Sequence, residues 1–378
     1  MHRTLLVLVL YVLTASFAPN PRDTPTTFSY TKEEIQALAD CPIPESTVTN
    51  DQLARMGNEV DFLVETANLP SIESTIFPAY LANAQKDFAW ISYRLTGKFA
   101  GSLGPVTLWT VRLFIPGASL PSVKAEDFDP FSSGIAALVI SKAAKRLKEE
   151  REQIADYPIR TGPEKWAPVN GSYVGLNYGT VKTWYLDSAK EFVIDTPPED
   201  MNFWKKECQE VLKIMAVRDG RQTERVFWWA HLPERNAGDW SAILQKYFEE
   251  NNTPLAARLW GRALFESAFL DSNAAAFNAK YVYWIKRPSQ IDPEIKPLVS
   301  VPSHPSYPSA HSTISGAVAV VLSELFPDNK DEWNATAEEA GLSRIWGGIH
   351  YPADHTKGAA LGEKVGHAVI DRSSNKKG

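Results

Sequence analysis

The chain has 378 residues, of which 44% are hydrophobic and 22% charged, and its formal net charge is -6. This composition is that of a globular protein and excludes a disordered chain, a collagen-like chain and a polytopic membrane protein. The acidic balance argues against a general nucleic-acid-binding protein, so no nucleic-acid partner is expected. Two cysteines, Cys41 and Cys208, exclude a disulfide-rich scaffold and a zinc site built from cysteines, and leave open whether they form one bridge.

The first 18 residues have the pattern of a secretory signal. Arg3 gives a positive start, an apolar run follows over 5–13, and Ala15 and Ala18 are small residues suited to cleavage. The apolar run is shorter than the roughly 20 residues that a membrane-spanning helix needs, which disfavours a membrane anchor. We predict that residues 1–18 are a signal peptide, that the protein is secreted or periplasmic, and that it has no membrane contact after signal removal.

Helical periodicity dominates the remaining sequence, and strand alternation is scarce. Apolar positions recur at helical spacing over 49–67 and again over 132–150. Between about 157 and 200, prolines, glycines and aromatic residues break the pattern, and a long irregular segment usually has a function or covers a site. We expect an all-α fold of helical bundles, with an N-terminal helical region over 19–195 and a C-terminal bundle over 196–378.

A long helix is predicted from about 254 to 286. Thr253 suits the N-cap and Pro254 the first helical position. Arg287-Pro288 ends the helix, because the residue before a proline is pushed out of the helical region.

Two further helices are expected, one beginning near Pro308 and one at Pro352. In the last helix, Gly358, Gly362 and Gly366 lie four residues apart, a spacing that suits close contact with another helix.

Three blocks between 280 and 354 combine cations with histidines. Lys280 and Arg287 are seven residues apart, or two helical turns, so they share a face if the helix persists that far. The second block, Pro308-Ser309-Ala310-His311, lies at a predicted helix start, where free backbone N–H groups favour an oxyanion.

The third block contains Ser343-Arg344, then His350 six positions after the arginine, then Asp354. Together the blocks supply three cations, a hydroxyl, backbone donors and two imidazoles. Such a set can hold a tetrahedral oxyanion, with one histidine bonding its central atom and the other moving protons.

Each of these residues alone has an ordinary structural explanation. Ser309 suits an N-cap, Asp354 suits the first turn of a helix because of the helix dipole, and His304 suits a loop. The combination is different, because each of its ten fixed positions is matched by chance about one time in 20.

The pattern Lys280-x6-Arg287-Pro288, Pro308-Ser309-x-His311 and Ser343-Arg344-x5-His350-x3-Asp354 resembles the superfamily of vanadium-dependent haloperoxidases and type 2 phosphatidic acid phosphatases. Three upstream features are similar to secreted bacterial-type haloperoxidases: Gly162-Pro163-x-x-Trp166-x-Pro168, Phe227-Trp228-Trp229 with Gly238-x-Trp240, and Asp271 nine positions before Lys280. Ala310 departs from the family, which usually has glycine there. Its backbone N–H remains, but the added methyl affects how closely an anion sits.

The resemblance implies vanadate as the cofactor, bound by Lys280, Arg287, Ser309, Ala310, Arg344 and His350. His350 would be the ligand of vanadium, and its other ring nitrogen needs an orienting acceptor, for which Asp354 is a candidate. His311 would be the acid/base and Lys280 would polarise the peroxide. His304 and Phe277 would line a halide pocket, which favours bromide or iodide over chloride.

The implied activity is that of a haloperoxidase, with hydrogen peroxide, a halide and a small organic acceptor as partners and with a possible homodimer. The phosphatase branch is the alternative and uses the same residues: His350 would form a phosphohistidine and His311 would protonate the leaving alcohol. The upstream resemblance and the predicted secretion favour the haloperoxidase. A non-catalytic oxyanion-binding protein would be expected to lack His311 or His350, and both are present.

Overall fold

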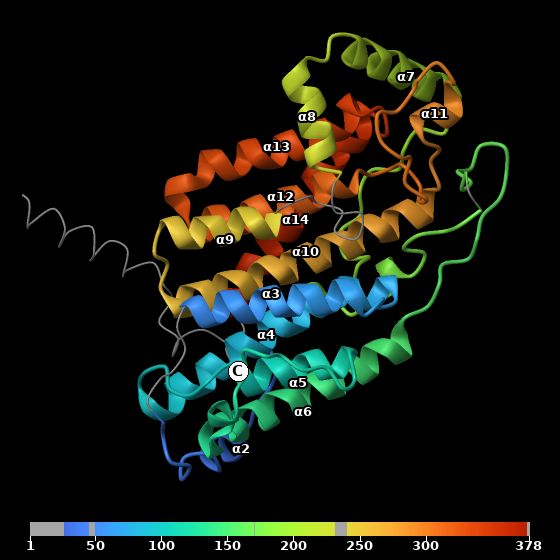
Figure 1. Ribbon diagram of the computed structural model, residues 1–378. Helices are drawn as coiled ribbons and strands as arrows, with labels where there is room; N and C mark the ends of the chain where they lie inside the picture. Colours follow the sequence, from blue (N-terminus) through green and yellow to red (C-terminus); the bar gives the residue numbers. More distant parts are fainter. Residues whose placement is uncertain (1–25, 45–49, 170, 231–239, 376–378) are drawn as a thin grey trace, which may run out of the picture. The chain divides into compact units, whose positions relative to one another are not determined.

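The computed structural model describes residues 26–44, 50–169, 171–230 and 240–375. Within these ranges all regular structure is helical and no strand occurs, which confirms the predicted all-α fold (Figure 1). None of the described helices combines the length and hydrophobicity that a bilayer span requires. The predicted signal peptide, residues 1–18, lies outside the described residues. Both cysteines are free.

The chain divides by contacts into two compact units. The first unit comprises Met1–Glu149, Phe248–Glu266 and Ser373–Gly378. The second comprises Glu150–Tyr247 and Ser267–Arg372. Each unit therefore contains discontinuous segments. The predicted boundary between 195 and 196 stays a prediction.

Helices of the first unit confirm the two early helical predictions. The helices are α2 (Lys32–Gln36), α3 (Asn50–Thr66), α4 (Ser71–Thr96), α5 (Gly104–Phe114) and most of α6 (Pro130–Gln153). In the core, Phe77 and Tyr80 of α4 meet Phe114 of α5 edge to face, with ring centroids 5.2 and 5.6 Å apart. Aromatic rings in this arrangement pack favourably beyond their buried area.

The second unit contains the three blocks that the sequence singles out. Its described helices are α7 (Met201–Ala216), α8 (Gly220–Trp228), α11 (Pro288–Ile291), α12 (Ala310–Leu325), α13 (Lys330–Trp346) and most of α9 (Trp240–Glu250), α10 (Leu255–Tyr283) and α14 (Pro352–Asn375). The segment 157–200 is irregular as predicted, apart from a 3-10 turn at Tyr178–Thr180. Buried Asp271 of α10 holds this segment, because its carboxylate accepts the backbone N–H groups of Trp184, Tyr185 and Leu186 at 2.7, 2.8 and 3.2 Å.

Helix α10 ends at Tyr283, so the predicted end near 286 is wrong. Trp284 adopts a left-handed backbone conformation with φ of 58°, which terminates a right-handed helix. Its fully buried indole packs against Trp166, and its carbonyl accepts the Trp166 N–H at 2.7 Å. Arg287 therefore lies in extended backbone just before α11, and it does not share a helix face with Lys280.

The glycine stripe of α14 packs against α12, as its spacing predicts. A Cβ atom placed on Gly362 would lie 2.1 Å from the Thr313 carbonyl oxygen, and one on Gly358 would lie 2.7 Å from the Ser309 carbonyl oxygen. Only residues without a side chain permit this approach. The contact brings the start of α14, which carries Asp354, beside the start of α12.

Candidate active site

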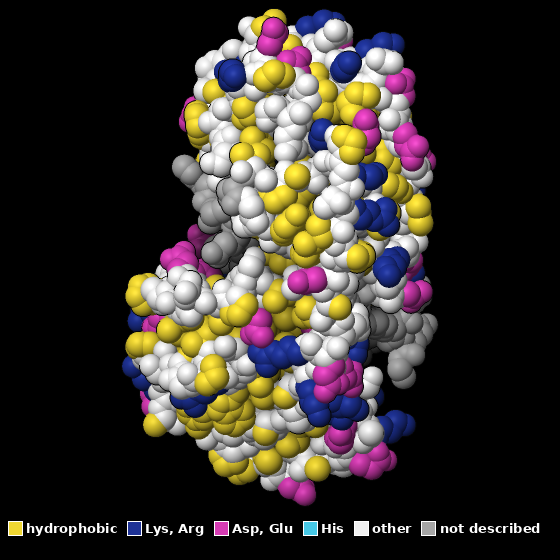
Figure 2. All heavy atoms as spheres, turned by 90° about the vertical axis from the view of Figure 1, so that its right-hand side faces the viewer, with side chains coloured by type: hydrophobic (Ala, Val, Ile, Leu, Met, Phe, Trp, Pro, Cys, Tyr) yellow, Lys and Arg dark blue, Asp and Glu magenta, His cyan; other side chains and the backbone are white. Residues whose placement is uncertain are grey.

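The histidines and cations of the three blocks are mostly enclosed in the second unit. His304 and His350 are buried, His311 is half-buried, and Lys280, Arg287 and Arg344 are buried. On the face drawn in Figure 2, Lys and Arg side chains are scattered among Asp and Glu side chains, and no described histidine is visible.

The tautomer of His350 follows from its two partners. Its Nδ1 lies 2.6 Å from Oδ2 of Asp354, four residues on in the first turn of α14. Its Nε2 lies 2.9 Å from Nη1 of Arg287, which can only donate. Nδ1 therefore carries the hydrogen and Nε2 presents a lone pair. Burial and then the charge of Arg287 lower the pKa of His350, which keeps the ring neutral.

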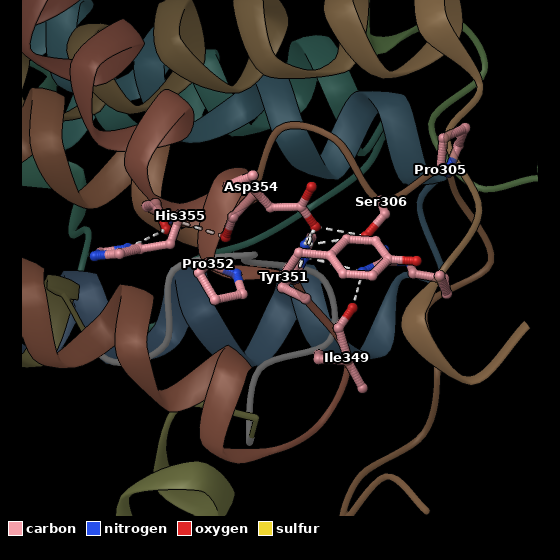
Figure 3. A network of polar contacts seen from close by, with 12 residues as sticks. Pro305, Ser306, Ile349, Tyr351, Pro352, Asp354 and His355 are labelled. Atoms are coloured by element: carbon pink, nitrogen blue, oxygen red, sulfur yellow. Dashed lines mark hydrogen bonds and ion pairs between the residues drawn. The ribbon is translucent and has the colours of Figure 1, made fainter. Parts of the chain in front are cut away.

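Asp354 is the acceptor at the centre of a buried network. Figure 3 shows its carboxylate pointing toward Ser306 and Tyr351; Oδ2 accepts the Ser306 hydroxyl at 2.6 Å and the Tyr351 N–H at 3.2 Å. Its other oxygen, Oδ1, is buried and has no hydrogen-bond partner among the described residues. Burial raises the pKa of Asp354 to about 6, although the Ser306 hydrogen bond and Lys280 oppose this shift. Asp354 is thus the hydrogen-bond acceptor for Nδ1 of His350.

Lys280 and Arg287 meet through the loop that carries His304. The Lys280 Nζ donates to the carbonyl oxygens of Pro305 and Ser306 at 2.8 and 2.7 Å. Arg287 donates from Nε to the His304 carbonyl at 3.1 Å, from Nη2 to its Nδ1 at 3.1 Å, and from Nη1 to the Ile349 carbonyl at 2.8 Å. The structure therefore brings these two cations to His350 by a tight turn and not by a shared helix.

Arg344 is held by a different element. Its Nη2 donates to the Val226 carbonyl of α8 at 2.7 Å, and its Nε donates to the Ser343 hydroxyl at 2.9 Å. Burial lowers the pKa of Arg344 to about 9 and that of Arg287 to about 10. The pKa of Lys280 also falls, because of burial and then the charge of Arg287.

The three cations have an unusual set of partners for buried charges. None of them lies within ion-pair distance of a carboxylate in the part of the chain that the structure describes, and their donors are met by carbonyls, a hydroxyl and imidazoles. Asp354 acts on Lys280 and Arg287 electrostatically. Buried cations are normally paired with anions. Two of the three cations share the single carboxylate of Asp354 and Arg344 has none, so the site keeps a positive charge that an external anion can neutralise.

The start of α12 supplies further donors, and its predicted position is confirmed. Ser309 is the N-cap: its Oγ accepts the Ser312 N–H at 3.3 Å, and its own N–H donates to the Asp354 carbonyl at 3.0 Å. The hydroxyl hydrogen of Ser309 is therefore available to another acceptor. Ala310 is buried at the first helical position, where a backbone N–H has no partner inside the helix.

His311 is positioned by the residue that follows α8. Its Nε2 lies 3.0 Å from the Trp229 carbonyl, which can only accept. Nε2 therefore carries the hydrogen and Nδ1 keeps a lone pair. Burial and then the charge of Arg344 lower the pKa of His311 well below its usual value. A neutral ring whose Nδ1 has no hydrogen-bond partner among the described residues is suited to accept a proton.

The rings of Phe277 and His304 pack together, with centroids 4.9 Å apart; their role as a halide pocket stays a prediction. Tyr178, from the irregular segment, also packs against Phe277, with ring centroids 4.8 Å apart. Gly175 adjoins the same ring at a positive φ of 69°, and a Cβ there would lie 2.3 Å from Phe277. The irregular segment therefore covers this part of the site.

Several groups in the site could not be predicted from the sequence. Ser306 is one of many loop serines, and nothing in the pattern distinguishes it. The carbonyls of Val226 and Trp229 carry no side-chain signature, although the Phe227-Trp228-Trp229 run marks their neighbourhood.

Comparison with known proteins places the site in a family. The pattern of the PAP2 superfamily matches residues 262–376. The decaprenylphosphoryl-5-phosphoribose phosphatase of Mycolicibacterium smegmatis is 36% identical over 129 residues, which are 34% of this chain and 67% of that protein. The chain belongs to the PAP2 superfamily. The phosphatase of the same name from Mycobacterium tuberculosis is 36% identical over 87 residues, 23% of this chain, so the chain spans about half (48%) of that relative's length.

Solved structures extend the likeness of this PAP2 protein beyond residues 262–376. A bacterial vanadium-dependent iodoperoxidase has a similar fold, with a TM-score of 0.65 and 21% identity over 87% of this chain and 98% of that one. A bacterial vanadium-dependent chloroperoxidase gives a TM-score of 0.54 and 13% identity over 96% and 97% of the two chains. The TM-scores show a shared helical fold, and at these sequence identities the likeness shows nothing beyond the fold. All residues of the three blocks lie inside the PAP2 stretch.

Replacing the carboxylate of Asp354, which accepts the His350 hydrogen bond, is expected to weaken anion binding by this PAP2 site. In Asp354→Asn, an amide replaces the charged carboxylate that orients His350, and such a change typically costs about 10- to 100-fold in affinity. Titration calorimetry with inorganic phosphate measures the effect. Asp371→Asn, on the exposed side of α14, is the matched control and should bind as the unaltered protein does. Equal affinity of the two variants would contradict the orienting role.

Proposed function

We propose that this PAP2-superfamily protein is a vanadium-dependent haloperoxidase. It would oxidise a halide, bromide or iodide in preference to chloride, with hydrogen peroxide, and the hypohalous acid would halogenate a small organic acceptor. The observation that carries the proposal is the pair of buried imidazoles, His350, whose Nε2 accepts from Arg287, and His311, on which all three buried cations act. None of these cations has a carboxylate partner within ion-pair distance among the described residues. Secretion and a homodimer are parts of the same proposal.

The residues present suit vanadate. A tetrahedral oxyanion needs positive charge and N–H or O–H donors around its oxygens, and Lys280, Arg287, Arg344 and the Ser309 hydroxyl supply them. The imidazole lone pair suits the central atom. When bound, vanadate supplies a Lewis acid that polarises hydrogen peroxide.

The protein's own groups would move the protons. Neutral His311 would accept a proton from hydrogen peroxide at Nδ1 and return it to the oxygen that leaves as water. Lys280 would draw electron density from the peroxide, so that the halide attacks one oxygen. The balance is hydrogen peroxide, halide and one proton giving hypohalous acid and water. Phe277 and His304 would form the wall that the halide meets.

Two observations favour the haloperoxidase over a phosphatase. The fold of the iodoperoxidase is matched over 98% of its length, including regions before the PAP2 stretch. The irregular segment closes over Phe277 and so encloses the site on that side, and exclusion of water protects a reactive oxidant.

A phosphatase is the second candidate, and the names of the sequence relatives support it. In that reaction the Nε2 lone pair of His350 would attack the phosphorus of a phosphate ester and form a phosphohistidine. His311 would protonate the departing alcohol oxygen, and water would then release phosphate. The same three cations would stabilise the transferred group.

Halogenation of a dione reporter separates the two candidates. The purified chain is supplied with hydrogen peroxide and bromide or iodide, with and without prior incubation with orthovanadate. The haloperoxidase predicts turnover that requires vanadate and that phosphate suppresses by competition. Absence of halogenation together with phosphate-ester hydrolysis that vanadate inhibits would overturn the proposal in favour of the phosphatase.

A further inference from the structure

His355 ties together three helices of the site. From the first turn of α14, its Nδ1 lies 3.0 Å from the Ser312 hydroxyl of α12, and its Nε2 lies 3.3 Å from a carboxylate oxygen of Glu338 on α13. The ring is 12% exposed. Figure 3 shows that His355 and its neighbour Asp354 point in opposite directions. One helical turn thus serves two separate networks.

The two contacts of His355 differ in their exposure to solvent, and therefore in how much each stabilises the junction. Glu338 is 58% exposed, so its hydrogen bond with the ring competes with water and contributes little. Ser312 is buried, and its hydroxyl has the ring as its partner. In the neutral ring, the Glu338 carboxylate takes the Nε2 hydrogen, which leaves Nδ1 to accept the Ser312 hydroxyl. The buried contact is the one expected to matter.

Helix α13 has a glycine, Gly341, where the His355 ring packs against it. A Cβ atom on Gly341 would lie 2.3 Å from His355 Nδ1 and 2.8 Å from the Ser312 hydroxyl oxygen. Glycine is therefore required where the three helices meet. Arg344 follows one turn later on the same helix.

Ser312 connects this junction to the anion site. Its N–H donates to the Ser309 hydroxyl oxygen, while the Ser309 N–H donates to the Asp354 carbonyl. The first turn of α12 is thus held by Asp354 on one side and by His355 on the other. Ser309 and His311 lie on this turn.

We propose that His355 is a positioning residue that holds the first turn of α12 so that the Ser309 hydroxyl and the His311 ring face the bound oxyanion. It acts through Ser312 and does not touch the anion. The inference rests on the anion site of the proposed function and holds for either vanadate or phosphate.

Two near-isosteric variants separate the contacts of His355. In His355→Asn the amide oxygen can take the place of Nδ1 and accept from Ser312. In His355→Gln the amide nitrogen reaches the place of Nε2 and can donate to Glu338. The measurements are the dissociation constant of inorganic phosphate by titration calorimetry and the melting temperature of the same samples.

We expect His355→Ala and His355→Gln to bind phosphate about fivefold more weakly, as for loss of one buried hydrogen bond, and His355→Asn to stay within about twofold of the unaltered protein. Ser312→Ala should match His355→Ala, and the double variant should lose nothing further, because both changes remove the same contact. Glu338→Gln is the control and should bind normally.

Four results would overturn the inference. Equal phosphate affinity in all variants would show that the contact does not reach the anion. Rescue by His355→Gln and not by His355→Asn would assign the effect to Glu338. If His355→Ala, His355→Gln and His355→Asn all bound phosphate more weakly, in proportion to a fall in melting temperature, the role of His355 would be structural. If the unaltered protein bound no phosphate, the anion site itself would be refuted, and with it this inference.

Discussion

His350→Ala is expected to abolish both anion binding and turnover. The change removes the Nε2 atom that would bond the central atom of the oxyanion, and it leaves Nη1 of Arg287 without its imidazole acceptor. Loss of a group that bonds the reacting centre typically costs about a thousandfold or more in rate. Phosphate titration and the halogenation assay, or ester hydrolysis if the phosphatase branch applies, measure the two effects.

His311→Ala is expected to separate anion binding from turnover. His311 is placed to move protons and not to bond the central atom, so its removal should leave phosphate binding nearly intact and still suppress turnover. His367→Ala is the matched control, because His367 lies on the exposed side of α14. Full turnover in His350→Ala would refute the site, and full turnover in His311→Ala would refute the acid/base role.

Gly362→Ala is expected to have the largest effect on stability. The new Cβ would lie 2.1 Å from the Thr313 carbonyl oxygen and 2.9 Å from the Ala317 nitrogen, both backbone atoms of α12 that cannot rotate away. The two helices must separate, and overpacking of this kind costs about 3 kcal/mol or more of the free energy of unfolding. Calorimetric melting of the variant against the unaltered protein measures the loss.

Gly57→Ala is the matched control for helix propensity. Gly57 is exposed in the middle of α3, and nothing lies within 4 Å of a Cβ placed there. The same substitution should stabilise the protein by about 0.5 kcal/mol, because alanine favours the helix over glycine. If Gly362→Ala melted like Gly57→Ala, the close contact between α12 and α14 would be refuted.

Much of the fold and of the site could be predicted from the sequence. Helix periodicity and capping residues predicted α3, α6, the start of α12 and the start of α14, because these signals are local. The glycine spacing predicted the contact of α14 with another helix. The order and spacing of Lys280, His311 and His350 indicated an oxyanion site, because such a site needs a cation, a group that bonds the central atom and a group that moves protons.

The way in which Lys280 and Arg287 come together could not be predicted from local sequence signals. The continuous helix that would align them ends at Tyr283, because Trp284 takes a left-handed conformation and buries its indole against Trp166. Helix propensity of a few tenths of a kcal/mol per residue does not outweigh burial of an aromatic side chain worth about 2 kcal/mol. The two cations still converge, by a turn that the periodicity does not reveal.

The sequence by itself therefore determined the helical class, the identity of the charged and titratable groups and their order along the chain. Only the tertiary structure decided which nitrogen of His311 and of His350 carries a hydrogen, since the partners that fix it are a carbonyl, a carboxylate and a guanidinium from other segments. It also brought Ser306 to Asp354 and Ser312 to His355. A backbone carbonyl has no residue type, and burial depends on contacts between distant segments, so neither leaves a local signal in the sequence.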